Sequence, residues 1–249
     1  MSDAIRPQPG DTYYSSWPLG QLRDEWKRPE LEQVRHLGVQ WTDAREIVDE
    51  FERRIADYCG SPYAVVTDSA SNALYLCLRY LDAHGLVSIP RRTYVSVAAQ
   101  LFHAGCQVSL RDEAWSGMYQ LAPLPIIDSA ARFRRSIFVP GNLQILSFQI
   151  KKTLPIGRGG AVLLDSKSAY DWLCLARQDG RDLTSAYTSP EHVQFLGWHF
   201  YMTPEDAARG ILLLQDLDGS EPDVASARNY PPLDGYEGIA SLFSSRAET

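Results

Sequence analysis

The chain has 249 residues, of which 45% are hydrophobic and 22% are charged, a composition typical of a soluble globular protein with one large core. The formal net charge of -7 provides no general basic field, which argues against binding to nucleic acid or to an anionic membrane through the whole surface. No apolar run approaches the roughly 18 residues of a membrane-spanning helix, and the polar amino terminus does not resemble a signal peptide, so we expect a cytoplasmic protein.

The four cysteines are widely spaced along the chain. They are Cys59, Cys77, Cys106 and Cys174, and none of them forms a C-x-x-C pair. Such spacing suggests neither a zinc site nor a disulfide framework. We expect buried free thiols and no bound metal.

The first predicted elements are an arm, a helix and a strand. Residues 1–40 are rich in proline, aromatic and charged residues with weak periodicity, which predicts an arm lying over the main domain. Apolar residues then recur at helical spacing from Thr42, and Gly60 and Pro62 predict the end of that helix. The apolar run at 63–67 predicts a strand.

From there to residue 217, helices and strands alternate. Helices are predicted at 72–84, 94–103, 168–177 and 204–216, and strands at 86–89, 106–110, 125–128, 143–148 and 160–165. Strands that alternate with helices favour an α/β domain with a mostly parallel sheet and helices on both faces. In such sheets, ligands bind where strands end and helices begin.

The end of the chain carries little periodicity. Residues 218–249 contain Pro231, Pro232 and Gly235 and are too few for a second core. We therefore expect the α/β domain to occupy 41–217 and a short irregular tail, packed or mobile, to follow it.

The segment 146–160 places two lysines between a strand and a glycine-rich return. A nucleophilic amine needs a lysine held partly out of water, so that its ammonium form is destabilised, and a strand end supplies a fixed position. Lys151 and Lys152 both follow the predicted strand. A solvated lysine pair in a loop is the alternative interpretation of this segment taken alone.

Three further segments carry polar or aromatic residues at junctions between predicted strands and helices. Ser69, Ala70 and Ser71 lie at a helix start, whose unpaired amides and positive dipole end suit a phosphate; an ordinary serine cap is the alternative. Asp128 directly follows two aliphatic residues, where a helix cap is the alternative. Tyr94 offers either a flat ring at a helix start or a half-buried core tyrosine.

Together the four segments resemble, in order and at similar intervals, the cofactor site of the DegT/StrS-like sugar aminotransferase family, whose members are pyridoxal 5′-phosphate (PLP) enzymes. The family's lysine segment reads S-F-x-x-x-K-x-L-x-x-G-E-G-G, and the residues in register are Ser147, Phe148, Lys152, Leu154, Gly157, Gly159 and Gly160. The phosphate segment N-S-G-T-x-A-L and the aromatic segment P-x-x-T-F/W-x-A have counterparts at 68–74 and 90–96. The resemblance implies the α/β large domain of a fold-type-I PLP-dependent transferase.

The resemblance also implies a role for each position. The five-residue offset from Ser147 selects Lys152 over Lys151 for the Schiff base with PLP, and Asp128 matches the acid that keeps the pyridine nitrogen protonated. Lys152 and Asp128 are thus the predicted catalytic residues. The predicted cofactor-binding residues are Ser69, Ala70, Ser71, Tyr94, Asp128, Ala131, Ser147, Lys152 and His199.

The chain departs from the family pattern at several places. Arg158 replaces the usual glutamate, and Ala131 replaces a glutamine or histidine that contacts the cofactor. In the downstream G-x-N-x-R-M segment, His199 replaces the asparagine that reaches the phosphate in the partner subunit; a packed cluster with Trp198 and Phe200 is the alternative. The chain also lacks most of the small carboxyl-terminal domain that covers the site in the family, so we expect a site open to bulky ligands.

Three functions are compatible with these features. The family resemblance favours an aminotransferase in which Lys152 releases PLP to the amino substrate and then moves its proton. The short chain and the altered pocket residues favour a PLP-dependent decarboxylase or lyase acting on an amino-acid unit attached to a bulky substrate such as a modified nucleotide or a DNA base. Nucleic acid is expected only as such a substrate. The third function is a PLP-binding or cofactor-free regulator. We also expect a homodimer with shared active sites.

Overall fold

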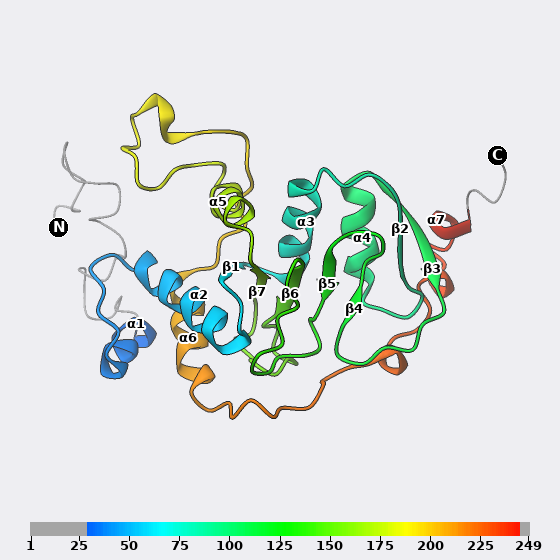
Figure 1. Ribbon diagram of the computed structural model, residues 1–249, viewed down its shortest axis with the longest axis horizontal. Coiled ribbons are helices and arrows are strands. Elements are labelled where there is room, and N and C mark those ends of the chain that lie inside the picture. The colour runs from blue at the N-terminus through cyan, green and yellow to red at the C-terminus, as the bar shows by residue number, and fades with distance from the viewer. Residues whose placement is uncertain (1–28, 245–249) are drawn as a thin grey trace, which may run out of the picture.

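Seven strands make up the centre of the described chain, residues 29–244 of a computed structural model (Figure 1). They are β1 (Tyr63–Thr67), β2 (Gly85–Pro90), β3 (Cys106–Arg111), β4 (Tyr119–Gln120), β5 (Ile126–Asp128), β6 (Leu143–Ser147) and β7 (Gly160–Leu164). Five of them form a sheet in the order β1-β7-β6-β5-β4, and β2 pairs with β3. A bridge between Ser88 and Ala122, with N···O distances of 2.7 and 3.1 Å, connects the two sheets.

The sheet is mixed in direction. β1, β5 and β6 run the same way, whereas β7 lies antiparallel between β1 and β6, and β4 is antiparallel to β5. The connections 121–125 and 148–159 contain no helix, and such short links join antiparallel strands rather than parallel ones. The predicted α/β class is confirmed, and the reversals at β4 and β7 are the detail in which the sheet differs from the mostly parallel one expected.

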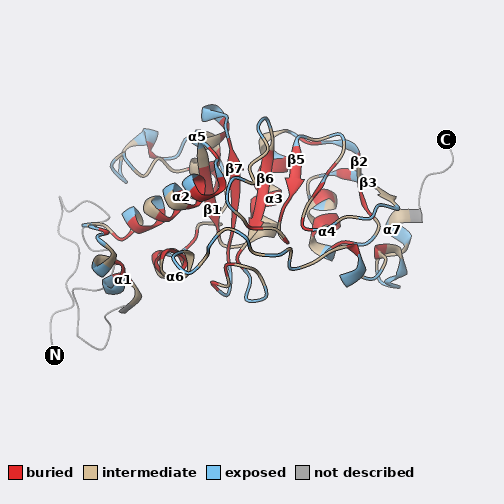
Figure 2. Ribbon diagram, turned by 60° about the horizontal axis from the view of Figure 1, so that its bottom comes forward, coloured by how far each residue is buried: buried red, intermediate tan, exposed pale blue. Residues whose placement is uncertain are grey.

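Helices cover both faces of the sheet, as predicted (Figure 2). They are α1 (Pro29–Gln33), α2 (Arg45–Cys59), α3 (Ala70–Tyr80), α4 (Val95–His103), α5 (Lys167–Ala176), α6 (Pro204–Leu214) and α7 (Ser241–Ser244), with 3-10 turns at Val34–Leu37, Pro190–His192, Ala227–Asn229 and Leu233–Gly235. In β1, Val65 belongs to the core under α3, α4 and α5, while Ala64 and Val66 belong to the core under α1, α2 and α6. Because both faces are buried, the strand reads as a continuous apolar run.

Most predicted boundaries agree with the structure. The strand at 63–67 is β1, and α2 ends at the predicted stop, where Gly60 adopts a φ of 74° and its N–H donates to the carbonyl of Ala56. The helix predicted to reach residue 84 ends at Tyr80, and Asp82 turns the chain with a φ of 46° before β2. The elements β4, α1 and α7 are too short for periodicity to predict them.

Residues 218–244, named here the C-terminal strap, cross from α6 to α7, which contacts β3 (Figure 1). The N–H of Val224 donates to the carbonyl of Ala131 (2.9 Å), and that of Leu233 donates to the carbonyl of Arg91 (2.9 Å). The side chain of Leu233 is fully buried. Of the two predicted alternatives, the described part of the tail, residues 218–244, is therefore packed, and the domain boundary at residue 217 stays a prediction.

Three smaller expectations concern the arm, the cysteines and the membrane. Residues 1–28 of the predicted arm lie outside the described residues, and the remainder forms α1 and a 3-10 turn that contact α6. All four cysteines are free thiols, as expected, and Cys59, Cys77 and Cys106 are buried, whereas Cys174 is only partly buried. Within 29–244, none of the helices has the length and apolar character needed to span a membrane.

Candidate functional site

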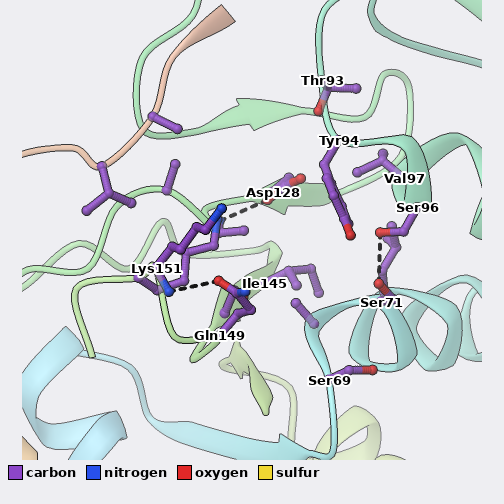
Figure 3. Close-up of a pocket in the computed structure, with 18 of the residues that line it drawn as sticks. Ser69, Ser71, Thr93, Tyr94, Ser96, Val97, Asp128, Ile145, Gln149 and Lys151 are labelled. Atoms are coloured by element: carbon purple, nitrogen blue, oxygen red, sulfur yellow. Dashed lines mark hydrogen bonds between the residues drawn. The ribbon is translucent and has the colours of Figure 1, made fainter. Parts of the chain in front are cut away.

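A cavity of about 700 Å³ lies at the ends of β1, β5 and β6 (Figure 3). Because these strands run in one direction, the residues that follow them meet at one edge of the sheet. Eight of the nine predicted cofactor-binding residues line this cavity, namely Ser69, Ala70, Ser71, Tyr94, Asp128, Ala131, Ser147 and Lys152. The ninth, His199, does not line it.

The loop that carries the lysines is closed on itself at its base. The N–H of Phe148 donates to the carbonyl of Gly159, and the N–H of Gly157 donates back to the carbonyl of Phe148, both at 3.0 Å. Within the loop the N–H of Lys152 donates to the carbonyl of Gln149 (2.8 Å), and the side chain of Leu154 is buried in the core. The loop therefore presents Lys152 from a fixed backbone.

The glycines of this segment are required for different structural reasons. Gly157 and Gly159 adopt φ values of 120° and 115°, which residues with a side chain rarely reach. At Gly160 a Cβ atom would lie 2.4 Å from the backbone nitrogen of Ala70, so only glycine lets β7 pass the start of α3 this closely. The glycine-rich return thus packs closely against the helix start, which also lines the cavity.

The two lysines differ in their surroundings. Lys152 is half-buried, whereas Lys151 is exposed. Burial lowers the pKa of Lys152, and the negative charge of Asp128 opposes that shift. A lowered pKa is what a nucleophilic lysine needs. The difference favours Lys152 over Lys151, in agreement with the register of the motif, and the role of Lys152 stays a prediction.

Asp128 is buried at the end of β5 and is held by two donors. Its Oδ1 accepts from the N–H of Ala130 (2.9 Å), and its Oδ2 accepts from the hydroxyl of Tyr119 (2.5 Å). The Tyr119 hydroxyl also lies 2.5 Å from Oγ1 of Thr93. Burial raises the pKa of Asp128, while the bond from Tyr119 and the charge of Lys152 act to lower it. Asp128 is therefore fixed in orientation, with Lys152 close enough to influence its charge.

Sequence reasoning did not identify Tyr119 as part of this site. Tyr119 lies in β4, a strand of two residues, and the chain between β3 and β5 has no periodic signal from which its direction could be inferred. Only the pairing of β4 with β5, which sets Tyr119 opposite Asp128, reveals the contact.

At the start of α3, Ser69 and Ser71 make different contacts. The Ser69 hydroxyl caps the helix by accepting from the N–H of Asn72 (3.2 Å), so the serine-cap alternative holds for this residue. The Ser71 hydroxyl donates to that of Ser96 at 2.8 Å and faces the cavity (Figure 3). A helix N-terminus flanked by hydroxyl groups is a suitable place for an anion.

Tyr94 and Ala131 contribute opposite kinds of surface. Tyr94 is 58% exposed, and its ring extends into the space between Asp128 and the Ser71–Ser96 pair (Figure 3). Ala131 is buried in the cavity wall and offers no polar group. The ring of Tyr94 is therefore available to stack on a flat ligand, and the core-tyrosine alternative does not apply.

Arg158, the departure within the lysine segment, is paired. Its Nη2 lies 2.6 Å from Oδ2 of Asp68, and its Nε donates to the carbonyl of Asp68 at 3.0 Å. Asp68 directly precedes the helix start that carries Ser69. The ion pair thus joins the end of the lysine loop to the segment that carries the start of α3, and Arg158 itself lines the cavity.

His199 lies on a different part of the surface. Its Nδ1 is 3.0 Å from Oδ2 of Asp179, and its side chain is two-thirds exposed. Its neighbours Trp198 and Phe200 pack edge-on against Tyr75, which is the aromatic cluster that the sequence offered as the alternative. Both interpretations therefore apply to parts of this segment, since the flanking rings are packed and the histidine itself is exposed.

Comparison with known proteins adds to this geometry. The sequence profile of the DegT/DnrJ/EryC1/StrS aminotransferase family matches residues 24–118, which confirms the resemblance predicted from the motifs. That resemblance implies an enzyme of the aminotransferase family with PLP as its cofactor. Among curated proteins, none matches the chain.

Several solved structures have the same fold. AtS13 from Actinomadura melliaura has a TM-score of 0.61 and 21% identity over 84% of this chain and 67% of its own. The sugar aminotransferase CalS13 from Micromonospora echinospora has a TM-score of 0.59 and 18% identity over 69% and 61% of the two chains. 3-Amino-5-hydroxybenzoic acid synthase has a TM-score of 0.59 and 18% identity over 83% and 64%. The chain thus spans 61 to 67% of the length of these proteins, and the likeness confirms the predicted fold class.

Proposed function

We propose that the chain is a PLP-dependent enzyme of the aminotransferase type, in which Lys152 holds the cofactor as a Schiff base. The observation that carries the proposal is the combination of a half-buried Lys152 and a buried Asp128 in one cavity that a helix N-terminus also lines. The fold and the family resemblance support the same conclusion.

The residues of the cavity fit the chemical parts of PLP. Lys152 is an amine of lowered pKa suited to the aldehyde, and Asp128 is a carboxylate suited to the ring nitrogen. Tyr94 offers a ring for stacking, and Ser71 and Ser147 offer hydroxyl groups to the phosphate at the start of α3. When bound, PLP supplies the electron sink that stabilises negative charge on the substrate carbon.

The chain's own residues then have defined tasks. Lys152 Nζ would take and return a proton at the substrate carbon, for which its lowered pKa suits it. Asp128, oriented by Tyr119 and by the N–H of Ala130, holds a proton on the ring nitrogen. Neither task requires a group that the described cavity lacks.

The decarboxylase or lyase acting on a bulky substrate remains the alternative. Its main support was a site left open by the short chain. In the structure, however, the C-terminal strap lines the cavity with Asn229 and Tyr230, so an open site no longer argues for a bulky substrate. We therefore place the aminotransferase first.

The test is spectroscopic and then chemical. Purified protein loaded with PLP should absorb in the visible range, and added amino donors with a keto acceptor should transfer the amino group. Release of carbon dioxide without transfer would replace the aminotransferase with the alternative. Failure to bind PLP at all would leave only a cofactor-free regulator on this fold.

We further propose a homodimer in which the segment 178–203 lies at the partner's site. The segment projects from the body of the molecule beyond α5 (Figure 1). It exposes Tyr187, Val193 and Leu196, the last at 91%, which is unusual for apolar side chains and suits a buried contact. His199 is carried on the same segment and is free of the chain's own cavity.

Light scattering tests the assembly. A dimer is expected. His199→Ala should weaken PLP binding while the protein stays dimeric. His103→Ala, at an exposed histidine of α4, should change neither PLP binding nor the dimer. A monomer that is active and loaded with PLP would rule the proposal out.

A further inference from the structure

The C-terminal strap forms one side of the same cavity. Val224, Ala225, Asn229 and Tyr230 line it, together with the helix start that carries Ser71. These residues come from the part of the sequence with the least periodicity, and no motif marks them. The strap is therefore a built part of the candidate site that the family resemblance does not assign.

An ionic clamp fixes the strap at Asp223. Arg132 donates to both carboxylate oxygens of Asp223 (2.8 and 2.7 Å), and Arg134 donates to Oδ1 (2.7 Å). The hydroxyl of Ser116 donates to Oδ2 at 2.8 Å. At Gly117 a Cβ atom would lie 2.5 Å from this carboxylate, so glycine is needed for the close approach. Two arginines and a hydroxyl thus hold the strap directly before the residues that line the cavity.

Tyr230 is connected to Asp128 through two aromatic contacts. Its ring stacks on Trp115 (centroids 5.8 Å apart, planes at 28°), and Trp115 packs on Tyr119 (4.8 Å). Tyr119 donates to Asp128. The backbone of Tyr230 is held as well, because its carbonyl accepts from Arg92 (3.0 Å). The strap therefore packs on the residue that orients the candidate acid.

Tyr230 lines the cavity. Among residues 29–244, its hydroxyl makes no hydrogen bond, although Asp128 and Tyr94 both lie close enough to raise its pKa. Tyr94 and Asp128 flank the space that the proposed function gives to the pyridine ring. A phenol that is half-buried beside a ligand site and lacks a partner gains most from an acceptor on the ligand.

We propose that Tyr230 is a cofactor-contacting residue supplied by the C-terminal strap, and that its hydroxyl donates a hydrogen bond to an oxygen atom of bound PLP. The inference rests on the proposed function, since it needs PLP in the cavity. Burial and the negative charge of Asp128 raise the pKa of Tyr230, which keeps the phenol protonated and able to donate near neutral pH.

The experiment compares PLP affinity among variants of the full chain, by absorbance titration without substrate. Tyr230→Phe keeps the ring that packs on Trp115 and removes only the donor, so its Kd for PLP should rise about 3- to 10-fold, as for one lost hydrogen bond. The matched control is Tyr236→Phe, at an exposed tyrosine of the same strap that does not line the cavity. Tyr236→Phe should bind PLP like the parent protein.

A second variant tests the strap itself. Asp223→Asn loosens the clamp and should speed PLP dissociation, although Asp223 does not line the cavity. The proposal is overturned if Tyr230→Phe binds PLP within about twofold of the parent protein or if Tyr236→Phe weakens binding equally. If the parent protein itself does not bind PLP, the proposed function fails first, and this inference fails with it.

Discussion

The cavity has two walls that are held in different ways. The strand-end wall consists of Ser69, Ala70, Ser71, Asp128, Ser147 and Lys152, and the strap wall consists of Val224, Ala225, Asn229 and Tyr230. The strand-end wall follows directly from strands that are buried between two hydrophobic cores. The strap wall depends on the Asp223 clamp, on a few backbone hydrogen bonds and on the buried side chain of Leu233.

This difference separates two properties of the site. Groups at the ends of buried strands are preorganised, and moving them requires disrupting the core. A segment held by polar contacts at the surface opens at lower free-energy cost. We therefore expect changes in the strand-end wall to alter chemistry without loosening the fold, and changes in the strap wall to loosen the cover of the site first.

The largest effect should come from Asp128→Asn in the strand-end wall. A neutral amide removes a charge-assisted hydrogen bond worth about 1.5–3 kcal/mol, which corresponds to roughly a 10- to 150-fold loss of turnover. PLP should still bind, and thermal stability should hold, because asparagine fits the same space. Steady-state kinetics beside Asp171→Asn, an exposed acid of α5, provides the comparison. Turnover near the parent value would remove Asp128 from its proposed role.

The strap wall should respond to pH through Asp223. Arg132 holds the pKa of Asp223 at about 2, below the usual value of 3.8, mainly by its hydrogen bonds. Because the folded-state pKa is lowered, the stabilisation is complete above about pH 4 and is lost as the pH falls towards 2. Denaturation of the parent protein and of Asp223→Asn should therefore differ at neutral pH and converge in acid. A difference that is independent of pH would contradict the clamp.

A smaller effect is expected for Ser71→Ala at the start of α3. The hydroxyl donates to Ser96 when no ligand is bound, so its net gain with a phosphate is modest, and Kd for PLP should rise by about 3- to 10-fold. Ser168→Ala, at an exposed serine of α5, is the control. An unchanged Kd for Ser71→Ala would move the phosphate away from this helix start.

The two walls also differ in how well the sequence predicts them. Strand positions, the glycine stop of α2 and the residues of the strand-end wall follow from local patterns and from motifs whose spacing is fixed by short loops. Gly157, Gly159 and Gly160 are examples, because the first two adopt a positive φ and the third allows a close backbone approach. Local patterns of this kind are readable without knowing the remainder of the fold.

The strap wall depends on contacts between distant residues, which no local pattern encodes. Asp223 meets Arg132 and Arg134 about ninety positions away in the chain, and Tyr230 reaches Trp115 across an even longer separation. Tyr119 shows the same limit at shorter range, because its two-residue strand gives no periodic signal. The strand order of the sheet also depends on contacts between distant residues, since β7 lies between β1 and β6.

The central claim is that Lys152 is the residue joined to PLP, and borohydride reduction tests it most directly. Reduction of the PLP-loaded protein, followed by digestion and mass spectrometry, should place the label on Lys152 alone. Lys151→Ala should be labelled like the parent protein, and Lys152→Ala should carry no label while remaining folded. A label on Lys151, or an equally strong label on Lys152→Ala, would contradict the account.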